Sequence, residues 1–161
     1  MATLSSVVCT SKLTMIGTIT KSDGQSIVDT LNKTIYSRVP TDMNWFIHNR
    51  YSVTTGADQS FDLASSLQNG LGEAASLTKV YGFEIRNLET TSGRVFRVGN
   101  SNFASWLGSA TDYVVVGPGG VLLLNNPIDG YTVTATSGDV FTVNNPGANT
   151  QQFEIVLYGK V

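Results

Sequence analysis

Turn dipeptides recur at short, even intervals between residues 111 and 161, and this spacing limits the fold more than any other feature. Pro118-Gly119 fits the two central positions of a type II turn, because proline fixes φ and glycine accepts a positive φ. Further turn signals are Asp129-Gly130, Ser137-Gly138 and Pro146-Gly147. The runs between them are rich in Val, Leu, Phe, Tyr and Thr: TDYVVVG, GVLLLNN, YTVTAT, DVFTVNN and QFEIVLYG. Turns separated by about 8–12 residues are typical of a β-sandwich or barrel.

Two kinds of apolar pattern occur in these runs. Phe153, Ile155 and Leu157 alternate with their neighbours, as in a strand with one buried face. By contrast, the apolar residues 114–116 and 121–124 are continuous. We expect these two runs to be central strands that are covered on both sides.

The rest of the chain also indicates strands. They are expected at 13–21, 44–53, 60–64, 77–87 and 94–98, with a hairpin turn at Asp23-Gly24 after the first. Residues 26–38 are ambiguous between a strand and a short helix, and residues 65–71 favour a helical turn closed by glycines. The sequence therefore predicts an all-β fold: a two-sheet antiparallel sandwich, jelly-roll-like, with extra N-terminal strands or an arm.

The domain organisation expected from the sequence is simple. Residues 1–12 are rich in Ser and Thr and are expected to form a flexible N-terminal arm. No linker divides the rest, so residues 13–161 are expected to be a single β-sandwich domain. A chain of 161 residues is long enough to bury a core without disulfides or metals.

Charge and hydropathy argue against two classes of partner. The net charge is −2 and the basic residues are scattered, so no nucleic-acid partner is expected. The longest apolar runs, Val114 to Val116 and Val121 to Leu124, are much shorter than a membrane span. The first residues do not resemble a signal peptide, so we expect synthesis in a cytoplasm.

Residues able to carry chemistry are few. Cys9 is the single cysteine, so we expect no internal disulfide and a small, inert side chain. His48 is the single histidine, and a partly buried or interface role is favoured over that of a catalytic base. The spacings typical of metal ligands are absent from the sequence. We therefore expect no enzyme activity, no catalytic residue, no metal and no cofactor.

Several motifs have both a functional and a structural interpretation. Two carboxylate pairs, Asp58 with Asp62 and Glu84 with Glu154, have the residue types of a glycosidase, but solvated strand faces are favoured. The glycine-rich residues 117–120 indicate a turn rather than a phosphate loop. The glycosylation acceptor at residues 32–34 is attributed to chance. Four aromatic residues suit a sugar site, but core or interface packing is favoured: Trp45, Tyr51, Trp106 and Tyr113.

From about Trp45 onward, the chain resembles a group of small structural proteins of tailed bacteriophages. The resemblance depends on segments in a fixed order: HNRYSVTTGADQSFDLASSL, YGFEIRN, FRVGNSN, DYVVVGPGGVLLLNNPIDGYTVTATSGDVFTVNN and FEIVLYG. It covers over two-thirds of the chain, and its most specific part begins at residue 118. The first forty or so residues match less well.

This resemblance implies a virion structural protein, specifically a capsid decoration (cement) protein on the outer surface of the assembled capsid. The implied partners are the major capsid protein and the protein itself, as a homodimer or homotrimer. The resemblance brings no catalytic residue with it. The alternative is a tail or fibre component that binds carbohydrate or a host receptor, because such components share small β-sandwiches.

Overall fold

The computed structural model describes residues 9–20, 26–38, 40, 42–65, 67–68, 72, 74–99, 107, 109 and 111–161. Every regular element within these residues is a β-strand, in agreement with the expected all-β class. The chain divides into two compact units, Met1–Thr41 and Asp42–Val161. The sequence predicted a boundary after Lys12 instead, and that position lies inside a strand.

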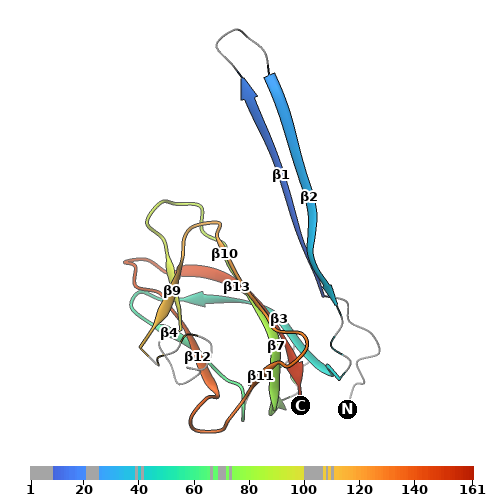
Figure 1. Cartoon of the computed structure of the whole chain (residues 1–161). Helices are drawn as coiled ribbons and strands as arrows, with labels where there is room; N and C mark the ends of the chain where they lie inside the picture. Colours follow the sequence, from blue (N-terminus) through green and yellow to red (C-terminus); the bar gives the residue numbers. More distant parts are fainter. Residues whose placement is uncertain are drawn as a thin grey trace. The chain divides into compact units, whose positions relative to one another are not determined.

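The first unit is a long β-hairpin (Figure 1). Strand β1 (Cys9–Thr20) pairs antiparallel with β2 (Ser26–Arg38), from Thr20 opposite Ser26 to Cys9 opposite Arg38. One irregularity interrupts the register, between Ser11 and Lys12. The ambiguous residues 26–38 are therefore a strand, while the turn expected at residues 23–24 lies outside the described residues.

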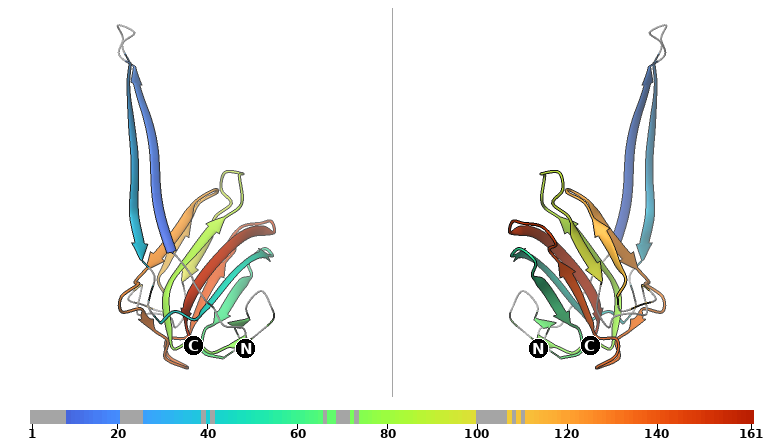
Figure 2. Two further views of the ribbon diagram at one scale, coloured as in Figure 1. Left: turned by 90° about the vertical axis from the view of Figure 1, so that its right-hand side faces the viewer. Right: turned by 90° about the vertical axis from the view of Figure 1, so that its left-hand side faces the viewer.

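The second unit contains two antiparallel sheets, and it is the expected sandwich. The first sheet has the order β10-β7-β13-β3, with β11 also paired to β7 (Figure 2). Its strands are β3 (Trp45–Val53), β7 (Lys79–Asn87), β10 (Val121–Asn125), β11 (Tyr131–Thr132) and β13 (Gln151–Lys160). The second sheet has the order β4-β12-β8-β9, from β4 (Asp58–Asp62), β8 (Phe96–Gly99), β9 (Tyr113–Val116) and β12 (Val140–Asn144). A short pair, β5 (Leu67–Gln68) and β6 (Ala74–Ala75), lies outside these sheets.

Aromatic side chains fill the space between the two sheets. Phe153 on β13 is fully buried and meets Phe96 on β8, with ring centroids 5.3 Å apart. Phe83 on β7 stacks on Phe141 on β12, also at 5.3 Å. The alternation expected along residues 153–157 is confirmed, because Phe153, Ile155 and Leu157 are all buried. Burial of such side chains is the main stabilising contribution in a sandwich core.

The predicted turns are only partly as expected. The Gly120 amide donates to the Gly117 carbonyl at 2.9 Å, and Gly119 has φ of +68°, as the predicted type II turn requires. At residues 146–147 an Asx turn occurs instead, in which Asn145 Oδ1 accepts the Gly147 amide at 2.9 Å. Near residues 137–138, the left-handed position is Thr136, with φ of +66°.

Two expectations for individual segments are wrong. The continuous apolar runs 114–116 and 121–124 are not in central strands, because β9 and β10 end their sheets and are partly exposed. An unbroken apolar sequence is therefore compatible with an edge strand, whose place depends on long-range pairing. The helical turn expected at residues 65–71 is replaced, in its described part, by the short strand β5.

Candidate functional site

The outward face of the first sheet carries a group of charged side chains, called here the charged face. Its members are His48, Arg50, Glu84, Arg86 and Glu154, from the neighbouring strands β3, β7 and β13. Strand alternation places them opposite the buried residues of the same strands. The register sets Glu154 between Arg50 on one neighbour and Arg86 on the other.

Glu154 is the centre of the ion pairs on the charged face. Arg50 Nε donates to Glu154 Oε2 at 2.8 Å, and His48 Nε2 lies 3.5 Å from Oε1. The Arg50 hydrogen bond is the largest cause that holds the pKa of Glu154 below its ordinary value. His48 thus lies on an exposed sheet surface beside a carboxylate, with 57% of its side chain accessible. Exposed pairs of this kind contribute little to stability.

The four carboxylates considered from the sequence lie on the charged face and on β4. A general acid needs a raised pKa, whereas the pKa of Glu154 is lowered. Asp58 accepts the Asn144 Nδ2 hydrogen bond at 2.7 Å on an edge strand. Asp62 closes a turn, because its Oδ1 accepts the amides of Ala64 and Ser65 at 3.0 Å each. Asp58 and Asp62 therefore make hydrogen bonds that hold β4 and the turn after it.

The three candidate sugar-binding aromatics that the structure describes lie in different surroundings. Trp45 is 7% exposed and belongs to the core. Tyr51 packs on Phe61 and Phe153 at 5.3 and 5.5 Å, so its ring is already occupied. Tyr113 is 45% exposed, and Arg97 lies 4.8 Å from its ring centroid. Trp106 lies outside the described residues.

One polar cluster was not found from the sequence. The buried Tyr81 hydroxyl donates to Asp42, and Lys160 Nζ donates to the same carboxylate at 2.9 Å. Burial, followed by the hydrogen bond to Asp42, raises the pKa of Tyr81 to about 12. The hydrogen bond from Tyr81 is the largest cause that lowers the pKa of Asp42. These residues join positions far apart in the sequence, so no local pattern indicates them.

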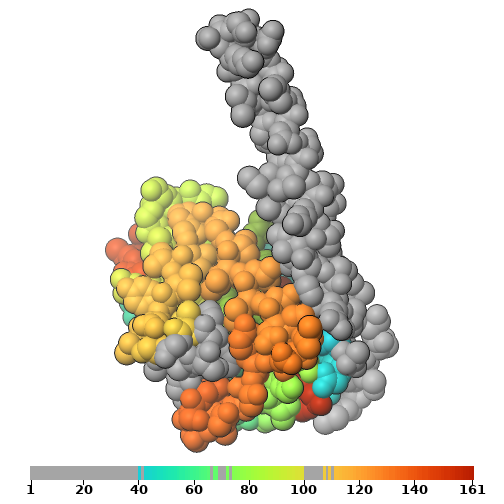
Figure 3. All heavy atoms as spheres, viewed as in Figure 1, coloured from blue at the N-terminus to red at the C-terminus, as the bar shows by residue number. Residues whose placement is uncertain are grey.

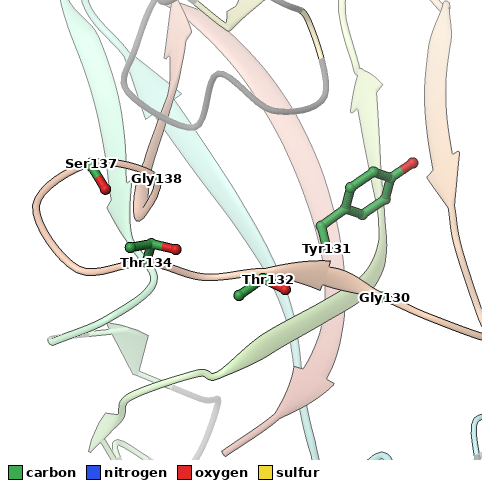
Figure 4. Close-up of a pocket in the computed structure, with 6 residues that line it drawn as sticks. All are labelled: Gly130, Tyr131, Thr132, Thr134, Ser137 and Gly138. Carbon is green, nitrogen blue, oxygen red and sulfur yellow. The ribbon is translucent and has the colours of Figure 1, made fainter.

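Two surface hollows are lined by described residues of the second unit. One, of about 340 Å³, is lined by Gly130, Tyr131, Thr132, Thr134, Ser137 and Gly138 (Figure 4). Figure 4 shows Thr134 and Ser137 on the loop that follows β11. The other, of about 350 Å³, is lined by Asn49, Tyr51, Gln59, Ser60, Phe61, Asp62, Leu67 and Gln68. The second hollow presents mainly polar groups, most of them hydroxyls and amides, which can donate and accept hydrogen bonds.

Five of the seven large exposed hydrophobic side chains among the described residues lie between residues 113 and 128, and they are called here the apolar edge. Its members are Tyr113, Val115, Val121, Leu123 and Ile128, each 44% to 67% exposed. They belong to β9, β10 and the loop after β10. These exposed side chains differ from the sequence-based expectation, which placed both runs in covered strands.

Two further observations concern metal ions and membranes. Among the described residues, no three His, Cys, Asp or Glu side chains are grouped so that they could hold a metal ion. The described part of the chain also has no helix long and apolar enough to cross a membrane.

Comparisons with known proteins do not assign a family. No family model matches the chain, and no curated protein matches it. A solved structure from Bacillus endospore appendages, described as a family of disulfide-linked pili, is similar at 14% sequence identity and a TM-score of 0.32. That similarity covers 80% of this chain and 99% of the other chain. At such a TM-score it carries no argument about function.

Proposed function

We propose that this protein is a virion structural protein of a tailed bacteriophage, and specifically a capsid decoration (cement) protein. It is made in the host cytoplasm, binds the outer surface of the assembled capsid and stabilises it. Its partners are the major capsid protein and further copies of itself. Its function is contact between protein surfaces, without catalysis, cofactor, nucleic acid or membrane.

The β1–β2 hairpin is the observation that carries this proposal. Its strands have 12 and 13 residues, and within the described residues each pairs only with the other. A two-stranded hairpin alone is marginally stable in water. Its register also sets Met15 opposite Leu31 and Ile19 opposite Ile27, which are apolar pairs. A hairpin of this length and composition is best explained as a segment that lies on a partner protein.

The identity of the partner comes from the resemblance to tailed-phage structural proteins. The quoted segments from Trp45 onward include the turn at residues 117–120 and the closing strand β13. In that group of proteins, the partner of a decoration protein is the capsid lattice. The lowered pKa of Glu154 and the structural hydrogen bonds of Asp62 favour a binding role over a hydrolytic one.

The physical mechanism is linkage between binding and assembly. A protein that binds the assembled lattice better than free subunits shifts the equilibrium toward the assembled state. Repeated copies over a symmetric shell convert weak individual contacts into high avidity. A sandwich with a well-packed aromatic core suits this role because it deforms little under load.

The proposal is tested by binding to capsids that lack the protein. The purified chain is expected to sediment with such capsids in a ratio of hundreds of copies per particle, and to raise the temperature at which they open. The variant Met15→Glu/Leu31→Glu sets like charges opposite each other in the hairpin, so its binding is expected to fall.

A matched control places the same charges on the sandwich. Ser52 and Gln152 are exposed and opposite each other, so Ser52→Glu/Gln152→Glu is expected to bind as the unmodified chain does. If the unmodified chain fails to sediment with capsids, or if the hairpin variant binds as well as the control, the proposal is wrong.

The alternative function is a tail or fibre component that binds carbohydrate. The hollow beside Asn49, Gln59 and Gln68 favours it, because amide groups pair well with sugar hydroxyls. Binding of the purified chain to host-surface glycans, with few copies per particle, would favour this alternative.

A further inference from the structure

The edge strands of a β-sandwich can form backbone hydrogen bonds with a strand of another chain. The four edge strands of this sandwich differ in the charge of their side chains. Among the described strands, the two sheets end at β3 and β10 and at β4 and β9. Strand β3 carries His48 and Arg50, and β4 carries Asp58 and Asp62. Charged side chains are a usual protection of an edge against pairing with another chain.

The other two edges lack this protection. Residues 113–128, which contain β9, β10 and the turn between them, include no Asp, Glu, Lys, Arg or His. Strand β10 contains no proline, and its pairing with β7 has no bulge. Val121 and Leu123 on this edge are 53% and 44% exposed. Figure 3 shows the residues coloured yellow to orange, which include this stretch, at the surface of the visible face.

Backbone geometry shows which groups of β10 are available. The Asn87 amide donates to the Gly120 carbonyl at 3.0 Å, and the Asn126 amide donates to the Tyr81 carbonyl at 2.7 Å. In an antiparallel pair the bonding direction alternates along the strand. The even-numbered residues of β10 therefore bond to β7, and the backbone groups of Val121, Leu123 and Asn125 point away from β7, toward the open edge.

We propose that β10 pairs antiparallel with β10 of a second copy of this chain, about a two-fold axis at Leu123. In this register Leu123 faces its own counterpart, and Val121 faces Asn125 of the other copy. Every outward amide and carbonyl from 121 to 125 then has a partner. The two first sheets become one continuous sheet, which gives a dimer rather than a trimer.

The absence of charged side chains on this edge favours a second copy of the chain as the partner that pairs with it. A two-fold axis sets each residue near the axis against its own type, so a charged edge would repel itself. The uncharged stretch of residues 113–128 has no such penalty, and it offers nothing that would select a charged partner. The two edges with His48, Arg50, Asp58 and Asp62 lack this self-complementarity.

Strand β10 is favoured over β9 for two reasons. The β9 strand is shorter and directly follows Asp112, whose charge lies at the end of that edge. The Tyr113 ring is also already in contact with Arg97. The inference rests on the proposed function only in taking a second copy of the chain as a partner.

The test is the mass of the purified full chain in solution. Light scattering at micromolar concentration is expected to give twice the mass of a single chain. Leu123→Lys places two like charges at the axis, and its side chain is on the exposed face, so we expect a folded monomer. Val115→Lys is the matched control on β9, at a residue that is 55% exposed, and it is expected to remain a dimer.

Hydrogen exchange provides a second measurement on the same samples. The amides of Val121, Leu123 and Asn125 are expected to be protected in the unmodified chain and to exchange rapidly in Leu123→Lys. A monomeric unmodified chain, a dimer that persists in Leu123→Lys, or rapid exchange of these amides in the unmodified chain would each overturn the inference. A monomer that still binds capsids would overturn this inference alone, whereas a dimer that does not bind them would overturn only the proposed function.

Discussion

Replacing Gly82 by alanine tests the packing of the first sheet at one well-defined point. Gly82 lies on β7, and the ring of Tyr158 from the neighbouring strand β13 passes over it. Tyr158 then donates its hydroxyl hydrogen bond to Asn125 Oδ1 on β10 at 2.8 Å. A Cβ atom at residue 82 would lie 2.6 Å from the Leu124 carbonyl oxygen and 2.7 Å from Cζ of Tyr158. Cβ atoms in protein structures essentially never lie so close to a non-bonded heavy atom.

The expected magnitude is a balance of opposite effects. Glycine in a strand interior is less stable than alanine by roughly 0.5–1 kcal/mol, so the backbone alone predicts that Gly82→Ala stabilises. Overpacking costs about 1–3 kcal/mol, and a displaced Tyr158 loses its hydrogen bond to Asn125, worth about 1 kcal/mol. We therefore expect Gly82→Ala to lower the free energy of unfolding by about 2 kcal/mol.

The assay is urea denaturation followed by tryptophan fluorescence, with the slope of the transition compared between variants. Gly117→Ala is the control, because nothing lies within 4 Å of a Cβ at that residue. We expect it to change stability by no more than about 0.5 kcal/mol. A Gly82→Ala protein as stable as the unmodified chain, or more stable, would refute the packing of Tyr158 across β7.

Three further predictions concern other parts of the molecule. Asn145→Ala removes buried hydrogen bonds to two carbonyls, one amide and one side chain. We expect urea denaturation to show that the free energy of unfolding falls by about 3 kcal/mol. A decrease of less than about 1 kcal/mol would contradict the buried network. The pKa of Tyr81 is raised from 10.0 to about 12, so stability is expected to fall as pH rises through that interval, because the unfolded chain ionises first. In an ultraviolet absorbance titration Asp42→Asn is expected to lower this pKa, and an unchanged titration would exclude the Tyr81–Asp42 hydrogen bond. Met15→Glu/Leu31→Glu is expected to speed amide exchange in β1 and β2 without shifting the denaturation midpoint of the second unit. Unchanged amide exchange would argue against the register of the hairpin.

Local patterns predicted the strands well because strand formation leaves a signal within a few residues. The alternation of Phe153, Ile155 and Leu157 identified the buried face of β13. Proline and glycine chemistry identified the turn that contains Gly119, whose φ is positive.

The same local patterns do not predict the order of strands in a sheet or the polar clusters that join distant residues. The runs at 114–116 and 121–124 are apolar enough for central strands, yet their place at the sheet edges depends on which distant strands pair with β7 and β8. The cluster of Tyr81, Asp42 and Lys160 joins residues separated by 39 and 118 positions. The division of the chain after Thr41 was missed because no change in composition marks it.

The most direct test of the proposed function is to image intact tailed-phage particles whose genome carries the sequence of this chain. We expect density for the sandwich in hundreds of copies at equivalent positions on the outer capsid surface, with the β1–β2 hairpin lying on the major capsid protein. A particle whose capsid carries no such density, or carries the protein only at the tail in a few copies, would contradict it.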